Sequence, residues 1–259
     1  MTRVFIAGAG TMGTQIAALC AKAELSVVVY DSDAGALARI AGRFETTPSL
    51  DAAAAADVVS ESIIEDLGAK RRFWAALSPI VRADTLLTTN TSTLLPSELA
   101  DAVAGPERFL AWHFHPPVER NRLVDVMGHA ETSPAAVAAI AELTRRLGHE
   151  PLVIAKEHRE YVFNSMLIAM LTAAQELAVD EVASIDDIDR AWCTATGMEL
   201  GPFAIMDLIG LDTLARIVDV GLQRNPNDKR LRRLLAWMKP KLAKGELGMK
   251  SGQGFYRYS

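Results

Sequence analysis

Residues 4–13 read Val-Phe-Ile-Ala-Gly-Ala-Gly-Thr-Met-Gly, and this stretch decides the fold. Its first four residues are apolar and predict a buried strand, and the glycines that follow match the pattern G-x-G-x-x-G. Helix-forming residues continue from 14 to 23, and residues 26–30 predict a second strand that ends just before Asp31. A strand, a glycine-rich turn, a helix and a strand followed by a carboxylate form the arrangement that binds a dinucleotide.

The positions of this pattern have physical roles in holding the cofactor. Gly8 permits a tight turn, and Gly10 lets the backbone approach a pyrophosphate at the helix N-terminus. Gly13 has no Cβ, which lets the helix and the strand pack closely. Asp31 can accept hydrogen bonds from both ribose hydroxyls and would repel the 2′-phosphate of NADP, so we predict NAD as the cofactor; an ordinary strand-to-helix turn is the alternative interpretation. The residues predicted to bind NAD here are Gly8, Ala9, Gly10, Thr11, Met12, Gly13 and Asp31.

The overall composition bounds the class of protein. The chain has 259 residues, enough for one large domain or two modest ones, and half of them are hydrophobic. The net charge of −5 argues against a nucleic-acid partner, and we interpret the basic stretch 229–233 as a solvated helix face. No uncharged apolar run reaches about 18 residues, so we expect no membrane span. The N-terminus does not resemble a signal peptide, and Cys20 and Cys193 stand alone, so we expect buried thiols in a cytoplasmic protein.

Predicted strands and helices alternate as far as residue 155, which is typical of a parallel sheet covered by helices on both faces. We therefore predict an α/β fold, a Rossmann-type, doubly wound, mostly parallel sheet, followed by a smaller all-helical domain. Gly8, Asp31, Glu61 and Ser92 each follow or end a predicted strand and should share one crevice at the carboxyl edge of the sheet. The further predicted strands are 43–46, 58–59, 85–89, 109–114, 123–127 and 152–155, and the helices are 34–41, 51–57, 66–81 and 134–147.

The sequence beyond residue 155 is predicted to be helical throughout. We place the domain boundary near Ala155–Lys156, with a dinucleotide-binding domain at 1–155 and a helical substrate or dimerisation domain at 156–259. The helix expected at 158–180 is apolar over so broad a face that it should be buried against other helices or a second subunit. The remaining helices are predicted at 185–196, 202–209, 212–223 and 228–238.

Four side chains are candidates for chemistry. His113 and Asp125 lie at the facing ends of two strands; if these pair as a hairpin, the carboxylate can bind one imidazole nitrogen and leave the other free as a general base. A structural histidine with a cross-strand acid is the alternative. Ser92 could hold a substrate oxygen or cap a helix. Asn164, which we expect to be buried, could bind a ligand or be a satisfied core amide. The other histidines lack cluster spacing, so we predict no metal.

The sequence resembles the 3-hydroxyacyl-CoA dehydrogenase family across nearly its full length. The resemblance implies NAD-dependent oxidation of a 3-hydroxyacyl substrate such as 3-hydroxybutyryl-CoA, or the reverse, by a dimer active in fatty acid metabolism. It implies that His113 is the base paired with Asp125, and that Ser92 and Asn164 hold substrate oxygens. The motifs that carry it are Gly8 to Gly13, Asn90 to Leu94, Phe109 to Phe114, Leu123 to Val126, Asn164, Gly201 to Phe203, Asp207 to Asp212 and Gly252 to Tyr256.

The resemblance also implies cofactor contacts at Glu65 and Lys70, which by themselves indicate only a helix start and an exposed lysine. The chain departs from the family in several places. The family's dyad acid is usually Glu, one methylene longer than Asp125, and the family motif H-F-F-N-P reads His-Phe-His-Pro-Pro at 113–117. Residues 159–161 read Arg-Glu-Tyr instead of Pro-Gly-Phe.

The remaining departure is a missing segment. The helical hairpin that helps the family to clamp acyl-CoA is absent, because Ala41-Gly42 passes almost directly into Phe44. We therefore expect little dependence on the CoA portion, with Arg159 or Tyr161 as possible substrate contacts. A dehydrogenase of free hydroxy acids, sugar acids or carrier-bound acyl groups is one alternative, and a non-catalytic NAD(H)-binding protein is another.

Overall fold

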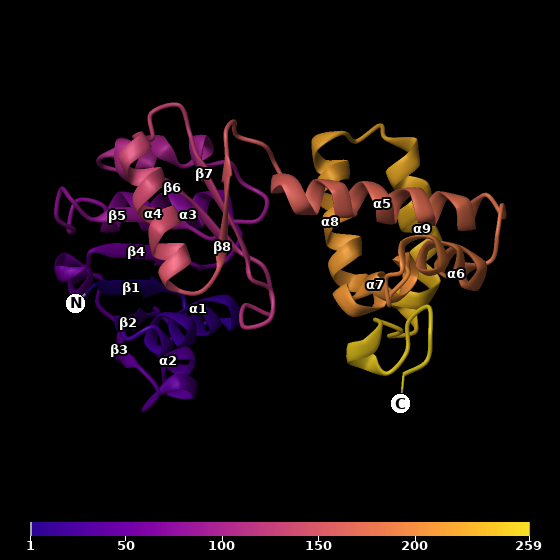
Figure 1. The fold of residues 1–259 in the computed structure, drawn as a ribbon, viewed down its shortest axis with the longest axis horizontal. Helices are drawn as coiled ribbons and strands as arrows, with labels where there is room; N and C mark the ends of the chain where they lie inside the picture. The colour runs from indigo at the N-terminus through magenta and orange to yellow at the C-terminus, as the bar shows by residue number, and fades with distance from the viewer. Residues whose placement is uncertain (1, 259) are drawn as a thin grey trace. The chain divides into compact units, whose positions relative to one another are not determined.

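The computed structural model describes residues 2–258 and divides the chain into two compact units that meet between Phe163 and Asn164. The first unit is an α/β domain and the second is helical (Figure 1). This division falls later than the boundary near Ala155–Lys156 expected from the sequence. The physical reason is that Tyr161, the first residue of helix α5, packs into the core of the first unit beside Ala111 and Met127.

The first unit contains one eight-stranded sheet in the order β3-β2-β1-β4-β5-β6-β7-β8. Strand β7 is antiparallel to β6, and all other neighbours are parallel, so the predicted doubly wound, mostly parallel sheet is confirmed. The strands are β1 (Arg3–Ala7), β2 (Ser26–Tyr30), β3 (Glu45–Thr47), β4 (Val58–Glu61), β5 (Leu86–Thr89), β6 (Phe109–Phe114), β7 (Leu123–Gly128) and β8 (Glu150–Ile154).

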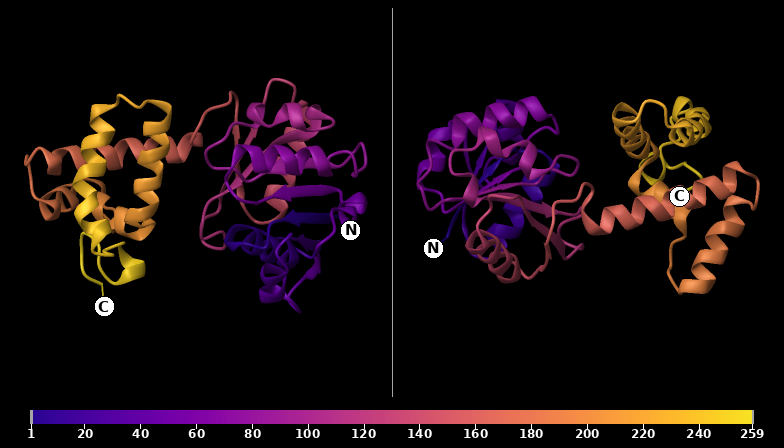
Figure 2. Two further views of the ribbon diagram at one scale, coloured as in Figure 1. Left: turned by 180° about the vertical axis from the view of Figure 1, so that it is seen from behind. Right: turned by 90° about the horizontal axis from the view of Figure 1, so that it is seen from above.

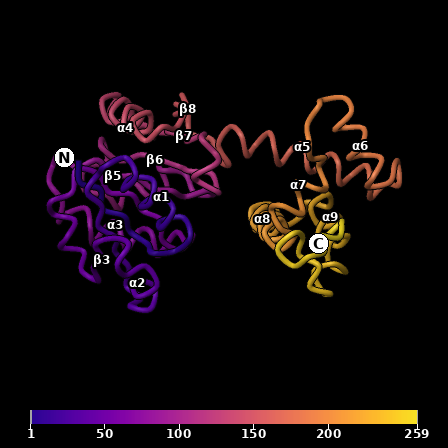
Figure 3. The backbone as a smooth tube through the Cα atoms, turned by 60° about the horizontal axis from the view of Figure 1, so that its bottom comes forward, coloured from indigo at the N-terminus to yellow at the C-terminus, as the bar shows by residue number. Residues whose placement is uncertain are grey.

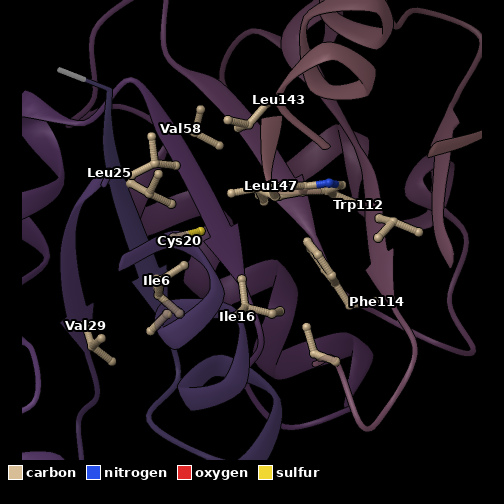
Figure 4. Close-up of a cluster of buried hydrophobic side chains, with 14 of the residues drawn as sticks. Ile6, Ile16, Cys20, Leu25, Val29, Val58, Trp112, Phe114, Leu143 and Leu147 are labelled. Carbon is tan, nitrogen blue, oxygen red and sulfur yellow. The ribbon is translucent and has the colours of Figure 1, made fainter. Parts of the chain in front are cut away.

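Helices cover both faces of this sheet (Figure 2). Side chains alternate along β1 because successive residues of a strand point to opposite faces. Val4 and Ile6 join the core beneath α1 and α4, shown in Figure 4, whereas Phe5 and Ala7 join the core beneath α3. The helices of this unit are α1 (Thr11–Lys22), α2 (Ala34–Ile40), α3 (Leu67–Leu77) and α4 (Pro134–Arg146), and the predicted helix at 51–57 is a 3-10 helix, Leu50–Ala55.

The connection between α2 and β3 is short. Helix α2 ends at Ile40, Ala41 pairs with Phe44 in an isolated bridge, and β3 begins at Glu45. No residues are available in this connection for a helical hairpin, as the sequence indicated.

The second unit is built mainly from α5 (Tyr161–Val179), α6 (Ile185–Thr196), α7 (Pro202–Ile209), α8 (Leu211–Arg224) and α9 (Lys229–Ala243) (Figure 3). Asp189 caps α7 by accepting hydrogen bonds from the backbone N–H groups of Phe203 and Ala204, at 2.8 and 3.0 Å. Asp207 is buried at the end of α7. Its carboxylate accepts three hydrogen bonds from the last stretch of the chain, from the backbone N–H groups of Phe255 and Tyr256 and the hydroxyl of Tyr258.

One expectation about the second unit needs correction, because Cys193 is partly exposed, whereas Cys20 is buried as predicted. Helix α5 leaves apolar side chains exposed in the single chain, with Met166 62% exposed and Leu177 43% exposed. The expected burial of α5 against a second subunit stays a prediction.

Helix α5 also bears on the expectation that no segment could span a membrane. It has 19 residues and a mean hydropathy of 1.5, which is long and apolar enough to cross one by length and composition alone. The expectation rested on the lack of an uncharged run, whereas this test allows the single acid Glu176, so the expectation stays a prediction. Core and interface helices pass the same test, so this finding is weak evidence for a membrane.

Candidate active site

The β6–β7 hairpin aligns His113 directly opposite Asp125, as the strand ends predicted. Nδ1–H of His113 donates to Oδ2 of Asp125 over 3.0 Å, and both side chains are buried. With the proton on Nδ1, Nε2 carries the lone pair, and it lies 3.1 Å from the hydroxyl oxygen of Ser92. The imidazole is therefore fixed in the tautomer that can accept a proton at Nε2.

Ser92 follows β5 and does not cap a helix, so that interpretation is wrong. Its backbone N–H, together with that of Thr93, donates to Oε1 of Glu65, at 3.0 and 2.9 Å. The hydroxyl of Thr91 donates to the same oxygen. Glu65 therefore shapes the loop that presents the Ser92 hydroxyl to His113.

His115 is a site residue that the sequence analysis missed. Its Nε2 lies 2.8 Å from Oδ2 of Asp125, the same oxygen that accepts from His113. The two imidazole rings meet edge to face, with centroids 4.6 Å apart. The signal was present, because residues two apart in an extended strand point to one face. One potential metal-ligand atom from each of His113, His115 and Asp125 lies within 4.8 Å of the other two, so the expectation that the histidines do not cluster is wrong. The hydrogen bonds from the two histidines to the Asp125 carboxylate account for this arrangement.

Tyr161 is a second missed residue. Its ring stacks on His113, with centroids 4.3 Å apart and planes inclined by 6°, and its hydroxyl donates to the carbonyl of Thr91 over 2.7 Å. Burial raises the pKa of Tyr161 well above its ordinary value, so the phenol stays neutral. Arg159 is also engaged, with Glu98 at 2.7 Å and the carbonyl of Thr93 at 3.0 Å. Both side chains therefore stabilise the segment around Ser92, and their contact with a substrate stays a prediction.

Burial and hydrogen bonds set the charge states of the pair. Burial lowers the pKa of His113 below its ordinary value, and the charge of His115 lowers it further, although the bond to Asp125 acts in the opposite direction. Burial acts to raise the pKa of Asp125, but the hydrogen bonds and charges of the two histidines outweigh it, so the pKa is lowered. Asp125 is therefore a carboxylate and His113 a neutral imidazole at neutral pH.

The glycine loop has the geometry that a bound dinucleotide requires. Gly8 has a φ of +107°, and a Cβ on it would lie 2.5 Å from the carbonyl oxygen of Ser62. A Cβ on Gly13 would lie 1.8 Å from the carbonyl oxygen of Gly8, whereas one on Gly10 would meet nothing within 4 Å, so this side is open. Thr11 and Met12 begin α1 directly after the loop. Asp31 accepts from the N–H of Ala9 over 2.8 Å, which ties the acid to the loop.

Lys70 is buried, not exposed as its position on a helix suggested. Its Nζ lies 2.6 Å from Glu61 and 3.3 Å from Glu65, and its side chain is 1% exposed. Glu61 belongs to β4 and also accepts from the Thr89 hydroxyl on β5. The lysine turns inward because a buried carboxylate at the end of β4 requires a cation.

Asn164 is the first residue of the second unit and is partly buried. The expectation that its amide is buried is therefore wrong, because this part of α5 has an exposed side. His113, Asp125 and Ser92 all belong to the first unit.

A separate groove of about 1010 Å³ borders the glycine loop at Gly10 and Thr11 and follows α1 away from it. None of His113, His115, Asp125 and Ser92 lines this groove, so the groove and the histidine cluster are separate features. The charged side chains that line the groove are Lys22, Arg39, Arg43, Arg122, Arg146 and Glu119.

Comparison with known proteins agrees with this geometry. The model of the 3-hydroxyacyl-CoA dehydrogenase NAD-binding domain matches residues 3–47 and 34–158, and that of the C-terminal domain of the same family matches residues 161–258. The chain belongs to the 3-hydroxyacyl-CoA dehydrogenase family. It is an oxidoreductase that uses NAD(H), and the resemblance found in the sequence is confirmed.

Individual relatives cover nearly the whole chain. A probable 3-hydroxybutyryl-CoA dehydrogenase of Deinococcus radiodurans is 31% identical over 98% of this chain and 99% of its own length. The structure of (S)-3-hydroxybutyryl-CoA dehydrogenase PaaH1 from Ralstonia eutropha is 30% identical, with a TM-score of 0.87 over 100% of this chain and 99% of that one. A diketoreductase described as acting on dicarbonyl compounds is 34% identical, with a TM-score of 0.92 over 100% of this chain and 99% of its own.

The comparisons also indicate residues that this chain lacks. The alignment with the Deinococcus relative spans 277 positions, more than the 259 residues of this chain, so the relative has residues that this chain lacks. The two matches to the NAD-binding model overlap at residues 34–47, the segment that holds the short α2–β3 connection.

Proposed function

We propose that this protein oxidises a 3-hydroxyacyl group, of the size of 3-hydroxybutyryl-CoA, to the 3-oxo form with NAD, or catalyses the reverse. The observation that carries the proposal is the line from Asp125 through His113 to Ser92, with separations of 3.0 and 3.1 Å. Nε2 of His113 would take the hydroxyl proton of the substrate, and Asp125 would hold the imidazolium that results.

The other predicted site residues have supporting roles in this proposal. The Ser92 hydroxyl would bind the reacting oxygen of the substrate, and Asn164 would supply a second hydrogen bond to it. NAD, when bound, supplies the acceptor for the hydride. Glu65 and Lys70 would line the cofactor, and Asp31 would bind its ribose. Nζ of Lys70 lies 3.3 Å from Glu65, so the two residues belong to one part of the molecule.

A second function is favoured by two observations. The diketoreductase relative has a TM-score of 0.92, and the connection that would carry the CoA clamp is only a few residues long in this chain. Reduction of a small dicarbonyl compound, or oxidation of a free hydroxy acid, is therefore the second candidate.

A substrate panel separates the two functions. NADH absorbance at 340 nm would be followed with both enantiomers of 3-hydroxybutyryl-CoA, with free 3-hydroxybutyrate and, in reverse, with a β-diketone. We expect the thioester to have the highest kcat/KM. A preference for the diketone would support the second function, and binding of NADH without turnover of any compound would support a sensor.

We also propose that the protein is a cytoplasmic homodimer in which a second copy covers α5. The exposed apolar side chains of this helix, with Met166 62% exposed, support an interface, and the free Cys20 supports a reducing compartment. Met166→Lys should shift the protein toward the monomer in analytical ultracentrifugation, and Arg190→Lys, on exposed α6, should not. An unchanged dimer in both variants would place the interface elsewhere.

A further inference from the structure

Two histidines share one oxygen of Asp125. Nδ1–H of His113 and Nε2–H of His115 both donate to Oδ2, at 3.0 and 2.8 Å, while Oδ1 is buried and has no hydrogen-bond partner among the described residues. We propose that His115 is a positioning residue, whose Nε2–H fixes the Asp125 carboxylate so that this shorter acid can support His113. The proposal rests on the proposed function in that His113 is the base.

The physical need for a second donor follows from the length of the acid. Asp125 has one methylene less than the glutamate usual in the family, so it cannot reach farther to adjust to the imidazole. A carboxylate with one donor can rotate about its last bond and exchange its two oxygens. Two charge-assisted hydrogen bonds to Oδ2, from His113 and His115, oppose this rotation. His115 stands where the family motif has an apolar phenylalanine, so the two departures of the chain from the family compensate each other.

The residues around His113 and Asp125 supply no second side-chain donor to the carboxylate other than His115 among the described residues. Tyr161 stacks on the other side of His113 and stays neutral, and Phe163 meets the edge of His115 with centroids 5.7 Å apart. Glu65 is the further acid whose charge acts on His113. Glu61 and Glu157 act on Tyr161. No other described side chain donates a hydrogen bond to Asp125.

His115 should affect the pH dependence as well as the rate. It competes for the carboxylate, and a positive charge on it disfavours protonation of His113. Replacing His115 by a neutral donor should therefore move the acidic limb of kcat/KM to higher pH. A residue that only fills space would not produce this shift.

The experiment compares three variants by kcat, KM and the pH profile. His115→Phe removes the donor, and kcat should fall about 10–100-fold, the usual effect of losing a partner that orients a functional ligand, with KM for NAD unchanged. His115→Gln keeps an N–H donor, and kcat should stay within about threefold, with the acidic limb shifted upward. The double variant His115→Phe/Asp125→Glu restores the family pair, and it should recover most of the loss.

A readout without turnover separates this proposal from the proposed function. In wild type, the ring N–H protons of both histidines should give low-field NMR signals, and Asp125→Asn should shift both. In His115→Phe, the His113 signal should broaden as the carboxylate loses its second donor. If the wild type turns over no compound but shows these signals, the proposed function fails and the placement of His115 stands.

Three outcomes would overturn the role of His115. One is a folded His115→Phe variant with wild-type kcat and pH profile. Another is equal loss in the Phe and Gln variants with no recovery in the double variant. The third is one equivalent of bound metal in the purified protein that is lost in His115→Phe, because the cluster would then be a metal centre.

Discussion

The hydroxyl oxygen of Ser92 lies 3.1 Å from Nε2 of His113, the nitrogen that faces away from Asp125. In the free protein the hydroxyl of Ser92 thus donates to the lone pair that a substrate hydroxyl would use. A substrate must displace this bond or share it, and its hydroxyl then lies between the two side chains. The relationship makes Ser92 a direct test of where the substrate oxygen binds.

Removal of the base gives the first prediction. His113→Gln keeps a hydrogen-bonding side chain but cannot accept a proton, so kcat should fall about 10²–10⁴-fold while NADH still binds. Ser92→Ala should raise KM for the hydroxy substrate, and it should lower kcat less than His113→Gln does. Stopped-flow absorbance and NADH fluorescence measure the two effects. Substantial activity in His113→Gln would show that another group takes the proton.

The lowered pKa of His113 predicts the pH dependence. Activity needs the neutral imidazole, so kcat/KM should fall on acidification only at a pH below about 6.5, the ordinary histidine value. Stability should follow the same group. The unfolded chain takes up the proton first, so the stabilisation from neutral His113 is complete above about pH 6.5 and is lost as pH falls toward the lower native value. Urea unfolding at a series of pH values measures it, with His113→Gln as the control that lacks this dependence.

Cofactor choice should depend on Asp31. Its carboxylate accepts from Ala9 and Asp33, which points it at the glycine loop and holds it there. Asp31→Ala should lower kcat/KM for NAD about 10–100-fold, which corresponds to losing a hydrogen bond to a charged group, and should affect NADP less. Equal kcat/KM for both cofactors in the wild type would contradict the assignment of Asp31 to the ribose.

The buried ion pair predicts a large loss of stability. Lys70→Met leaves the buried Glu61 carboxylate without its cation, which should cost about 3–5 kcal/mol of unfolding free energy in the absence of NAD. Lys22→Met is the matched control, because Lys22 is exposed, and its effect should stay within about 0.5 kcal/mol. Denaturant unfolding followed by circular dichroism measures both. A stable Lys70→Met protein would show that the ion pair between Lys70 and Glu61 contributes little to folding stability.

The absent hairpin predicts tolerance of a truncated substrate. A thioester that ends in a pantetheine-like stub should have a kcat/KM within about 100-fold, or roughly 2.7 kcal/mol, of the CoA ester. The double variant Arg39→Glu/Arg43→Glu reverses charge in the groove beside α1. If the CoA ester is preferred by more than this limit and the double variant abolishes the preference, the groove has replaced the clamp.

Backbone-level features of the site could be predicted from the sequence. The His113–Asp125 alignment follows from where two apolar strands end, because a hairpin between them leaves few registers. The glycine loop is equally local, since the φ of Gly8 and the contact of Gly13 depend on a few consecutive residues and the neighbouring strand. The absence of the hairpin could be predicted because few residues separate the helix that ends near Ala41 from the strand that begins near Phe44.

Side-chain partners from distant segments could not be predicted. Lys70 looked like a surface residue because its helix is amphipathic, and only the adjacent end of β4 supplies the carboxylate that draws it inward. The stacking of Tyr161 on His113 joins residues far apart in sequence through a turn with positive φ at Glu160 and Tyr161. The role of His115 is not evident from sequence spacing, because its partner Asp125 comes from the opposite strand of the hairpin and also binds His113.

The three hydrogen bonds that hold the Asp207 carboxylate have a consequence for biosynthesis. Two of its partners come from backbone groups at residues 255 and 256, and the third is the hydroxyl of Tyr258. While the chain is still being translated, α7 emerges from the ribosome with a carboxylate that has none of these donors. The helical unit therefore cannot complete its folding until residues 255–258 have emerged, whereas the β6–β7 hairpin with His113 and Asp125 emerges earlier.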